Sequence, residues 1–244
     1  MKLLDWIPLE KLCWKQLSMN PNAIHLLEKN LDKIDWGYLS MNRNAIHLLK
    51  KNPEKINWYW LSINPNAIHL LEQNPEKISI CNLSSNPSAL HLLDHETIAW
   101  ICLSENPSPD AIKLLEKNPH KINWEWLSRN PSAIHLIEKN LDKIDWHYLS
   151  LNPSAIHLLE KNPDKIYWTY LAENPNAIHL LEKNPKMIFW ENLSKNPSIF
   201  VEDYQSLCKE RSEILREELM AKTWHPERFR SWCLDTEDEF YLEI

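Results

Sequence analysis

Glycine is almost absent from this sequence. Gly37 is the single glycine among 244 residues, whereas proline occurs 16 times and tryptophan 13 times. Phosphate-binding loops and dinucleotide-binding turns need glycine, because a Cβ atom would keep their backbone away from the ligand. The sequence therefore excludes nucleotide-dependent enzymes built on such loops, and we expect no cofactor.

Long apolar runs and a basic excess are also missing. The formal net charge is −7, and Asp5 and Pro8 interrupt the apolar stretch at the N-terminus. A secretory signal needs an unbroken apolar run there, and a membrane span needs about 18 or more apolar residues. We therefore expect a protein that is not secreted and does not enter a membrane. An acidic chain binds nucleic acid only through a local basic stripe.

Cysteine is scarce and irregularly placed. The five cysteines are odd in number, and their spacing shows no pattern typical of a disulfide framework. We expect five free thiols in a reducing compartment. The residues are Cys13, Cys81, Cys102, Cys208 and Cys233.

What the sequence does contain is a repeat. Nine asparagines each begin a near-copy of NPNAIHLLEKNPDKINWxxLSx, 22 residues apart except for one spacing of 20 and one of 24, which compensate each other. A half-unit at 8–18 matches the second half of the motif. The first residues of the repeats are Asn20, Asn42, Asn64, Asn86, Asn106, Asn130, Asn152, Asn174 and Asn196.

A typical repeat holds two Asn-Pro pairs, 13 in the whole sequence, and these predict two short helices in each repeat. Asparagine is a preferred N-cap residue, and proline fits the first helical position because its missing N–H would be unpaired there. Helices this short are unstable alone and must be held by stacking. The sequence predicts an all-α, right-handed solenoid of short paired helices, α/α or α/3₁₀, over 1–197. A helical C-terminal cap and an acidic tail are expected over 198–244, with a long helix at 199–222 and a short one through Trp232.

The Asn-Pro-punctuated unit resembles the leucine-rich-variant class of α-solenoids. The consensus sequence of the repeat, NPNAIHLLEKNPDKINWxxLS, is similar to the repeats of the tandem-repeat proteins of giant DNA viruses. The segment ELMAKTWHPERFRSWCLD at 218–235 is similar to a C-terminal segment of those proteins. The resemblance implies a repeat architecture and a viral protein, located in the host cytoplasm or the virion. It implies no reaction.

Histidine recurs at one position on the outward side of the first predicted helix, and an acidic residue follows it three positions later in most repeats. We expect each histidine to lie beside that carboxylate, which would raise the imidazole pKa. Metal binding is disfavoured, because helices packed about 8–10 Å apart cannot bring their ligands to one ion. We interpret this histidine column as a solvated face or a surface for a partner. It comprises His25, His47, His69, His91, His135, His157 and His179.

Tryptophan recurs in the second half of the repeat, and we predict that it fills the core, because Ile80 replaces it once and isoleucine packs without stacking. The tryptophan column comprises Trp14, Trp36, Trp58, Trp100, Trp124, Trp146, Trp168 and Trp190. The position two residues later is variable and often aromatic, which favours partner contact there. Its aromatic members are Tyr38, Trp60, Trp126, Tyr148 and Tyr170.

The expected function is a non-enzymatic scaffold that binds proteins. No Ser, Cys or Asp recurs at an offset from histidine that would suit a catalytic triad, so we predict no enzyme. A virion structural component, such as a minor capsid or cement protein, is the first alternative. A nucleic-acid binder that uses the lysine columns around the mid-repeat turn is the second, disfavoured because acidic residues alternate with those lysines.

Overall fold

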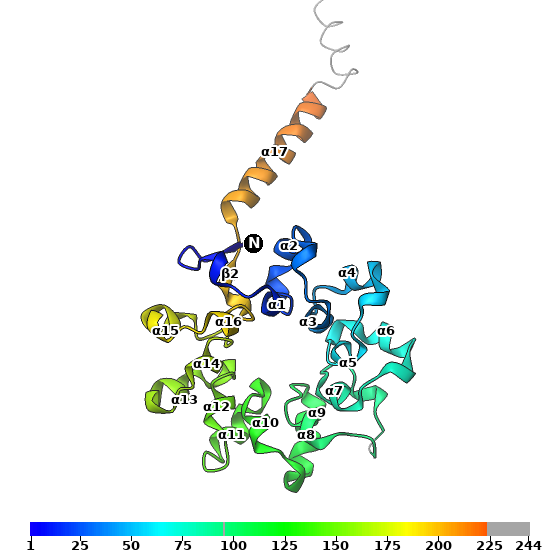
Figure 1. The fold of residues 1–244 in the computed structure, drawn as a ribbon, viewed down its shortest axis with the longest axis vertical. Coiled ribbons are helices and arrows are strands. Elements are labelled where there is room, and N and C mark those ends of the chain that lie inside the picture. Colours follow the sequence, from blue (N-terminus) through cyan, green and yellow to red (C-terminus); the bar gives the residue numbers. More distant parts are fainter. Residues whose placement is uncertain (95, 224–244) are drawn as a thin grey trace, which may run out of the picture. The chain divides into compact units, whose positions relative to one another are not determined.

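The repeats close into a ring (Figure 1). The computed structural model describes residues 1–94 and 96–223, and one compact unit comprises Met1 and Leu3–Val201. The predicted all-α repeat architecture is confirmed. The unit ends four residues beyond the predicted boundary at 197. The expected short helix through Trp232 and the acidic end lie outside the described residues.

Two layers of short helices build each repeat. The inner helices are α1 (Trp14–Leu17), α3 (Trp36–Met41), α5 (Trp58–Leu61), α7 (Ile80–Ser85), α8 (Trp100–Leu103), α10 (Trp124–Ser128), α12 (Trp146–Leu149), α14 (Trp168–Leu171) and α16 (Trp190–Leu193). The outer helices are α2 (Ile24–Glu28), α4 (Ile46–Lys51), α6 (Ile68–Glu72), α9 (Pro109–Lys117), α11 (Ile134–Glu138), α13 (Ile156–Lys161) and α15 (Ile178–Lys183). Figure 1 shows α4, α6, α13 and α15 on the outside of the ring.

Short 3₁₀ turns connect these helices, and most of them begin at the proline of an Asn-Pro pair, where the start of a helix was predicted. They are Leu9–Lys11, Pro21–Ala23, Leu31–Lys33, Pro53–Lys55, Pro65–Ala67, Pro75–Lys77, Leu90–Leu92, Pro119–Lys121, Pro131–Ala133, Pro153–Ala155, Pro163–Lys165, Pro185–Met187 and Pro197–Ile199. The turn Leu90–Leu92 stands where the other repeats have an outer α-helix, in the repeat that is two residues short. The next repeat, two residues longer, has the nine-residue α9. The outer layer therefore absorbs both changes in length.

Nine buried asparagines, the first residues of the nine repeats, form a continuous chain of hydrogen bonds that we call the asparagine ladder. Each side-chain amide donates to the carbonyl of the preceding ladder asparagine at 2.8–3.0 Å. It also donates to the carbonyl two residues before that asparagine. Each side-chain oxygen accepts the predicted capping bond from the N–H two residues later. Because Asn20 donates to Asn196, the ladder runs through the full circle.

The second Asn-Pro asparagine of the repeat has another role, so the prediction that it caps the following helix is wrong. In seven repeats its side-chain amide donates to the carbonyl four residues earlier at 2.8–2.9 Å and thereby ends the outer helix. The inner helix takes its cap from the residue just before tryptophan instead. Asp35, for example, accepts from the Tyr38 N–H at 3.0 Å.

A serine column adds a second link between repeats. Each serine hydroxyl donates to the carbonyl of the tryptophan-column residue four positions earlier, as Ser150 does to Trp146 at 2.9 Å. The same hydroxyl accepts an N–H from the next repeat, as Ser150 accepts from Tyr167 at 3.0 Å. The fully buried members are Ser18, Ser40, Ser62, Ser84, Ser104, Ser128, Ser150 and Ser194, and Ala172 occupies the remaining position. These polar side chains are retained in the core because the stacked backbones need their hydrogen bonds.

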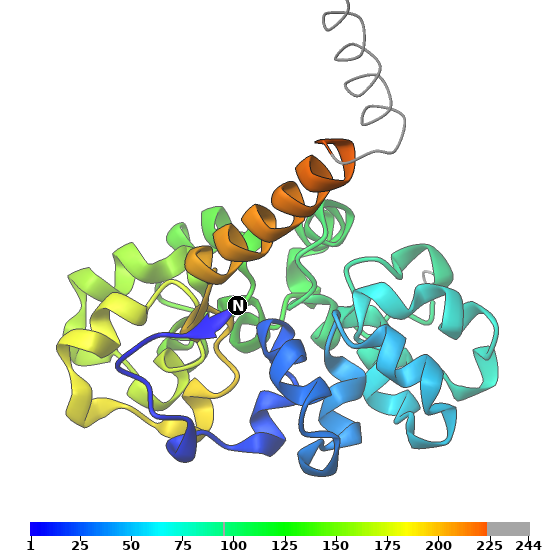
Figure 2. The same cartoon turned by 90° about the horizontal axis from the view of Figure 1, so that it is seen from above.

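The ninth repeat is assembled from the two ends of the compact unit. Its first half is the segment that begins at Asn196, and its second half is the N-terminal half-unit. The Cys13 N–H donates to the Ser194 hydroxyl at 2.8 Å, in the register of every other serine contact. Figures 1 and 2 both place α1 and the N-terminal segment beside the last repeat. The predicted solenoid therefore closes on itself, and its terminal faces cover each other.

A small sheet replaces the outer helix of this split repeat. The strands β1 (Lys2–Leu3) and β2 (Phe200–Val201) pair, and the Leu4 N–H donates to the Ile199 carbonyl at 2.9 Å. Beyond Val201, the predicted long helix at 199–222 is present as α17 (Tyr204–Thr223).

The core consists mainly of leucine and alanine. One leucine from each inner helix is at most 1% exposed: Leu17, Leu39, Leu61, Leu83, Leu103, Leu127, Leu149, Leu171 and Leu193. One alanine from eight repeats is 0% exposed, and Ile199 takes its place in the ninth: Ala23, Ala45, Ala67, Ala89, Ala111, Ala133, Ala155 and Ala177. The small alanines leave room for neighbouring repeats to pack closely.

The tryptophan column, predicted to fill the core, is only half-buried. One face of each indole packs on the core, and seven of them carry a lysine ammonium over the ring, 4.2–5.1 Å from its centroid. Such cation–π contacts cover the outer face of the indole while the charge stays hydrated. The lysines that cover the indoles are Lys11, Lys33, Lys55, Lys77, Lys121, Lys143 and Lys165.

Candidate functional site

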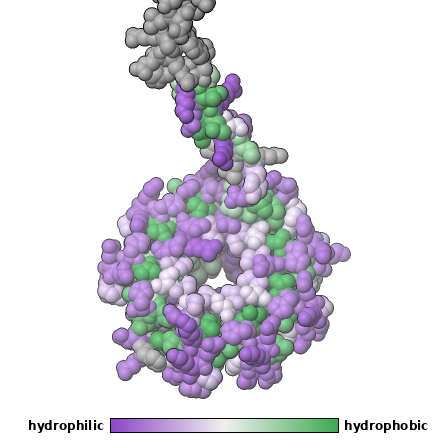
Figure 3. Space-filling model, turned by 180° about the vertical axis from the view of Figure 1, so that it is seen from behind, coloured by the Kyte–Doolittle hydropathy of each residue, from purple (hydrophilic) through white to green (hydrophobic). Residues whose placement is uncertain are grey.

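A cavity of about 660 Å³ lies on the inner face of the ring. Its volume is within the range of about 300–1,000 Å³ that is typical of ligand pockets. The space-filling view shows an opening at the centre of the ring (Figure 3). The wall is mainly aromatic and aliphatic, and it includes Tyr38, Tyr59, Trp60, Trp100, Ile101 and Trp126.

Ring closure brings the predicted variable aromatic position to this inner face. Tyr38, Trp60 and Trp126 line the cavity. Tyr148 and Tyr170 continue the row beside it, because Trp126 stacks on Tyr148 at 6.4 Å and Tyr148 packs on Tyr170 at 5.7 Å between ring centroids. The aromatic residues singled out from the sequence at this position therefore share one surface.

Other cavity residues were not predicted from the sequence. Tyr59 is 53% exposed and Ile101 is 56% exposed, although both follow directly after the tryptophan column. Met19, Met41 and Ile63, at the end of the inner helices, also line the wall. The sequence feature that could have identified these residues is the variation of their positions from repeat to repeat, which the position two residues after the tryptophan column also shows.

Charged groups in the cavity wall are held by partners within the chain. Arg129 Nε lies 3.2 Å from a carboxylate oxygen of Glu105, whose side chain is only 10% exposed. Lys195 Nζ lies 2.7 Å from a carboxylate oxygen of Glu173. Both pairs are partly withdrawn from water, which strengthens the attraction between their charges. The cavity therefore presents aromatic faces between two neutralised ion pairs.

Tyr148 has a polar environment at this surface. Burial is the main cause that raises its pKa, and a hydrogen bond to Glu125 raises it further. The phenol therefore stays protonated at neutral pH and acts as a hydrogen-bond donor.

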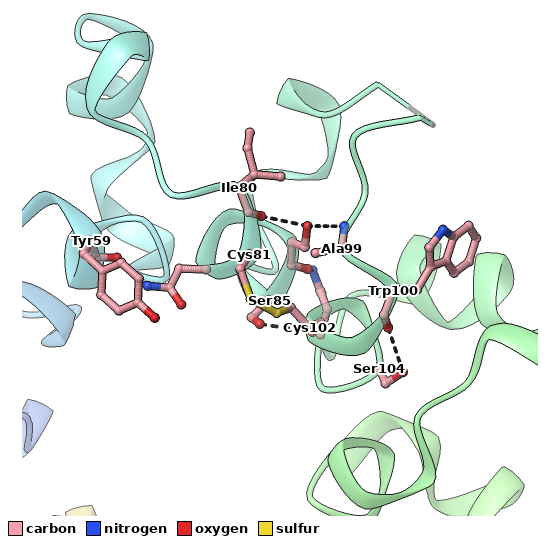
Figure 4. The surroundings of a disulfide bond; sticks show 11 residues. Tyr59, Ile80, Cys81, Ser85, Ala99, Trp100, Cys102 and Ser104 are labelled. Carbon is pink, nitrogen blue, oxygen red and sulfur yellow. Dashed lines mark hydrogen bonds between the residues drawn. A yellow bond between two sulfur atoms is a disulfide. The ribbon is translucent and has the colours of Figure 1, made fainter.

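A disulfide lies in the cavity wall, so the expectation of five free thiols is wrong. Cys81 on α7 is bonded to Cys102 on α8, with 5.7 Å between their Cα atoms (Figure 4). Sequence spacing missed the pair because the cysteines occupy different positions of neighbouring repeats, and stacking brings those positions together. Among the described cysteines, Cys13 and Cys208 are free.

Reduction of this disulfide is expected to lower the free energy of unfolding by about 3 kcal/mol, because the bond closes a loop of about 20 residues in the unfolded chain. Cys81→Ser should produce the same loss and abolish the response to reductant, as measured by urea unfolding with and without dithiothreitol. Cys208→Ser is the matched control and should behave as wild type. Equal stability of oxidised and reduced protein would contradict the prediction.

The histidine column lies on the outer layer, away from the cavity, and its predicted pairing within one helix is wrong. Each paired histidine contacts the carboxylate of the preceding repeat. The distances are 2.8 Å for His47–Glu28, 3.8 Å for His91–Glu72, 2.9 Å for His135–Glu116, 2.9 Å for His157–Glu138 and 3.0 Å for His179–Glu160. These histidine side chains are 45–60% exposed. His69 is opposite Lys50, the basic exception in the acidic column.

His25 begins the column and lies at the closure of the ring. Its imidazole packs edge-on against Phe200, with ring centroids 5.6 Å apart. Burial is the main cause that lowers its pKa, and the positive N-terminus and Lys29 act in the same direction, whereas a hydrogen bond to the Asn22 backbone and the charge of Glu28 partly offset them. The expected rise in pKa is therefore wrong for this histidine.

Acidification is expected to weaken the closure at His25. Because the folded pKa lies below the ordinary value of about 6.5, the unfolded chain binds the proton more readily, and stability falls as pH drops below that value. Replacement of His25 by Gln should reduce the loss of stability between pH 7 and pH 5, measured by thermal unfolding. His120→Gln, which changes an exposed histidine outside the column, should leave the pH dependence unchanged. An identical pH dependence in the His25 variant would contradict the prediction.

A metal site requires a cluster of acidic, histidine or cysteine side chains, and a membrane span requires a helix of high apolar content. Within residues 1–94 and 96–223, no three His, Cys, Asp or Glu side chains gather where they could hold an ion. Over the same residues, no helix combines the length and hydrophobicity that a membrane-spanning segment requires.

The fold and the cavity together define a closed nine-repeat α-solenoid with an aromatic inner face. Comparison with protein-family models, curated proteins and solved structures finds no match to this chain.

Proposed function

We propose that this protein is a non-enzymatic binding module that holds a protein partner on the inner face of the ring. The observation that carries the proposal is the contrast between the ladder positions and the cavity positions. Asparagine occupies all nine ladder positions because the backbone needs its hydrogen bonds. The fold makes no such demand on the variable aromatic position two residues after the tryptophan column, so its half-buried rings can contact a ligand on the inner face.

The outer surfaces support this choice. The ammonium groups of one lysine column lie over tryptophan rings, and most of the histidine column is paired with carboxylates. A partner that used these groups would have to displace contacts within the chain. The cavity offers exposed aromatic surface at Tyr59, which is 53% exposed, and its other rings are partly covered, since Arg129 lies over Trp126 at 5.7 Å and Lys15 lies over Tyr38 at 5.1 Å.

The viral origin of the chain, its place in the host cytoplasm or the virion, and the alternative role as a minor capsid or cement protein stay predictions from the sequence. These predictions address the location of the protein, whereas the cavity bears only on how the protein binds a partner. The nucleic-acid alternative loses support, because six lysines of its columns already cover indole rings.

The test compares proteins captured by three immobilised forms of the chain. Wild type and an outer variant, His157→Gln with His179→Gln, should capture the same partner from a lysate, identified by mass spectrometry. An inner variant, Tyr59→Asp with Trp60→Asp, should lose it while its helix content and urea unfolding remain close to those of wild type. Retention by the inner variant and loss by the outer one would overturn the proposal.

A further inference from the structure

The charges and hydrogen-bonding groups of the cavity wall restrict the ligand. The wall residues Arg129 and Glu105 form an ion pair, and the wall residue Lys195 is paired with Glu173. A charged ligand would have to break one of these partly buried pairs or remain without a counter-charge in the cavity, which is costly. Charge complementarity therefore favours a neutral ligand.

The aromatic side chains supply apolar faces and hydrogen-bond donors. Tyr38, Tyr59, Trp60 and Trp126 line the cavity, and each ring carries an O–H or N–H at its edge. An indole N–H can only donate, so the matching ligand needs acceptors beside its apolar surface. A purely aliphatic chain would leave these donors without partners.

A polyproline II segment has this combination. Its pyrrolidine rings are apolar, proline has no N–H, and its carbonyls are not bonded within the segment. An α-helix, in contrast, has already used most of its carbonyls internally. The polyproline II conformation also exists before binding, so little conformational entropy is lost on docking.

We propose that the cavity binds a proline-rich segment of a partner protein in the polyproline II conformation. The inference rests on the proposed function and names the chemistry of the partner. Pyrrolidine rings pack against the exposed ring of Tyr59 and the parts of Trp60 and Trp126 that Tyr59, Arg129 and Tyr148 leave uncovered, and the tyrosine and indole edges donate to the carbonyls between them. The aromatic residues come from different repeats, so ring closure is what places them around one segment.

The probe is fluorescein-labelled decaproline, titrated with the full chain and followed by anisotropy. Saturable binding is expected, at least tenfold tighter than that of a labelled Gly-Ser decamer. Trp60→Leu and Trp126→Leu should each weaken it at least tenfold. Trp60→Phe, which keeps the aromatic face but loses the N–H, should show a smaller loss.

Controls separate the site from folding and from other ligands. Phe189→Leu changes an aromatic side chain that is 48% exposed outside the cavity wall, and it should bind decaproline as wild type does. Tyr59→Leu changes an exposed wall residue and should weaken binding while urea unfolding is preserved. Absence of saturable decaproline binding, or equal binding by wild type and the Trp60 and Tyr59 variants, would overturn the proposal. Preferential binding of oligothymidylate or of a fatty acid would overturn it as well.

The two proposals fail in different ways. A partner that the inner variant loses, but that binds through a segment without proline, would leave the proposed function standing and reject this inference. If the chain binds decaproline at the cavity but only the outer variant loses the cellular partner, the proposed function is rejected. The binding of a proline-rich segment by the cavity would then still stand.

Discussion

Replacing Asn152 by alanine is expected to lower the free energy of unfolding by about 3–9 kcal/mol, because two buried carbonyls and one part-buried N–H would each lose a partner at about 1–3 kcal/mol. The side-chain amide donates to the carbonyls of Ser128 and Asn130, and the side-chain oxygen accepts from the Ser154 N–H. Asn152 is 0% exposed, so water cannot replace these bonds. Urea unfolding followed by circular dichroism measures the loss.

Asn140 provides the matched control in the preceding repeat. Its amide donates only to the Leu136 carbonyl at 2.9 Å, at a half-buried site, so Asn140→Ala should cost about 1 kcal/mol. Asn152→Asp keeps the acceptor for the Ser154 N–H but places an oxygen against two carbonyls, and it should be at least as destabilising as the alanine variant. Equal losses for Asn140→Ala and Asn152→Ala would show that the ladder contributes nothing beyond an ordinary cap.

Deletion of residues 1–19 is expected to open the ring and cost about 5–9 kcal/mol. The segment contains Ile7, Leu12 and Leu17, which are at most 6% exposed, and burial of each such side chain contributes about 1.5–3 kcal/mol. It also supplies the Cys13 N–H to Ser194 and the Lys11 ammonium over Trp190. Both terminal faces of the solenoid would be uncovered.

These uncovered faces complement each other, so the truncated chain should associate head to tail. Size-exclusion chromatography with light scattering should show larger assemblies for the truncated chain than for the full chain. A synthetic peptide of residues 1–19 added to the truncated chain should reverse this association, because it carries the missing half of the ninth repeat. A truncated chain that matches the full chain in both assembly size and stability would contradict closure by this segment.

The sequence predicts the elements of each repeat well because their signals are local. Asn64 followed by Pro65 specifies a cap and a first helical residue within two positions, and the structure has both. The amide of Asn64 also bonds to Ser40 and Asn42, more than 20 residues away. A short sequence motif cannot predict a hydrogen bond between residues so far apart, so the sequence did not predict the asparagine ladder.

The same limit explains the histidine and cysteine corrections. His157 was expected beside Glu160 in its own helix, but it contacts Glu138 at 2.9 Å because stacking places neighbouring repeats side by side. For the same reason Cys81 meets Cys102, which occupies a different position of the next repeat. Contacts of this kind depend on the stacking register, which a repeat alignment does not contain.

The candidate site was predicted in part. Variation at the position of Trp60 and Trp126 indicated residues that the core does not constrain, and these residues line the cavity. That they surround a common space depends on the curvature of the solenoid. Curvature arises from small differences in packing between the inner and outer layers, and no single residue type specifies it.

Closure also fixes how many copies of the repeat this protein can have. Nine repeats complete the circle, so each contributes a rotation of about 40°. An open solenoid can gain or lose a unit by unequal recombination and still fold, since its ends remain free. Here the loss of one unit would prevent the Asn20 amide from reaching the Asn196 carbonyl, and a gain would force the ends past each other. Gain or loss of a whole unit is therefore expected to disrupt closure, whereas the outer layer accommodates changes of two residues, as in the repeats of 20 and 24 residues.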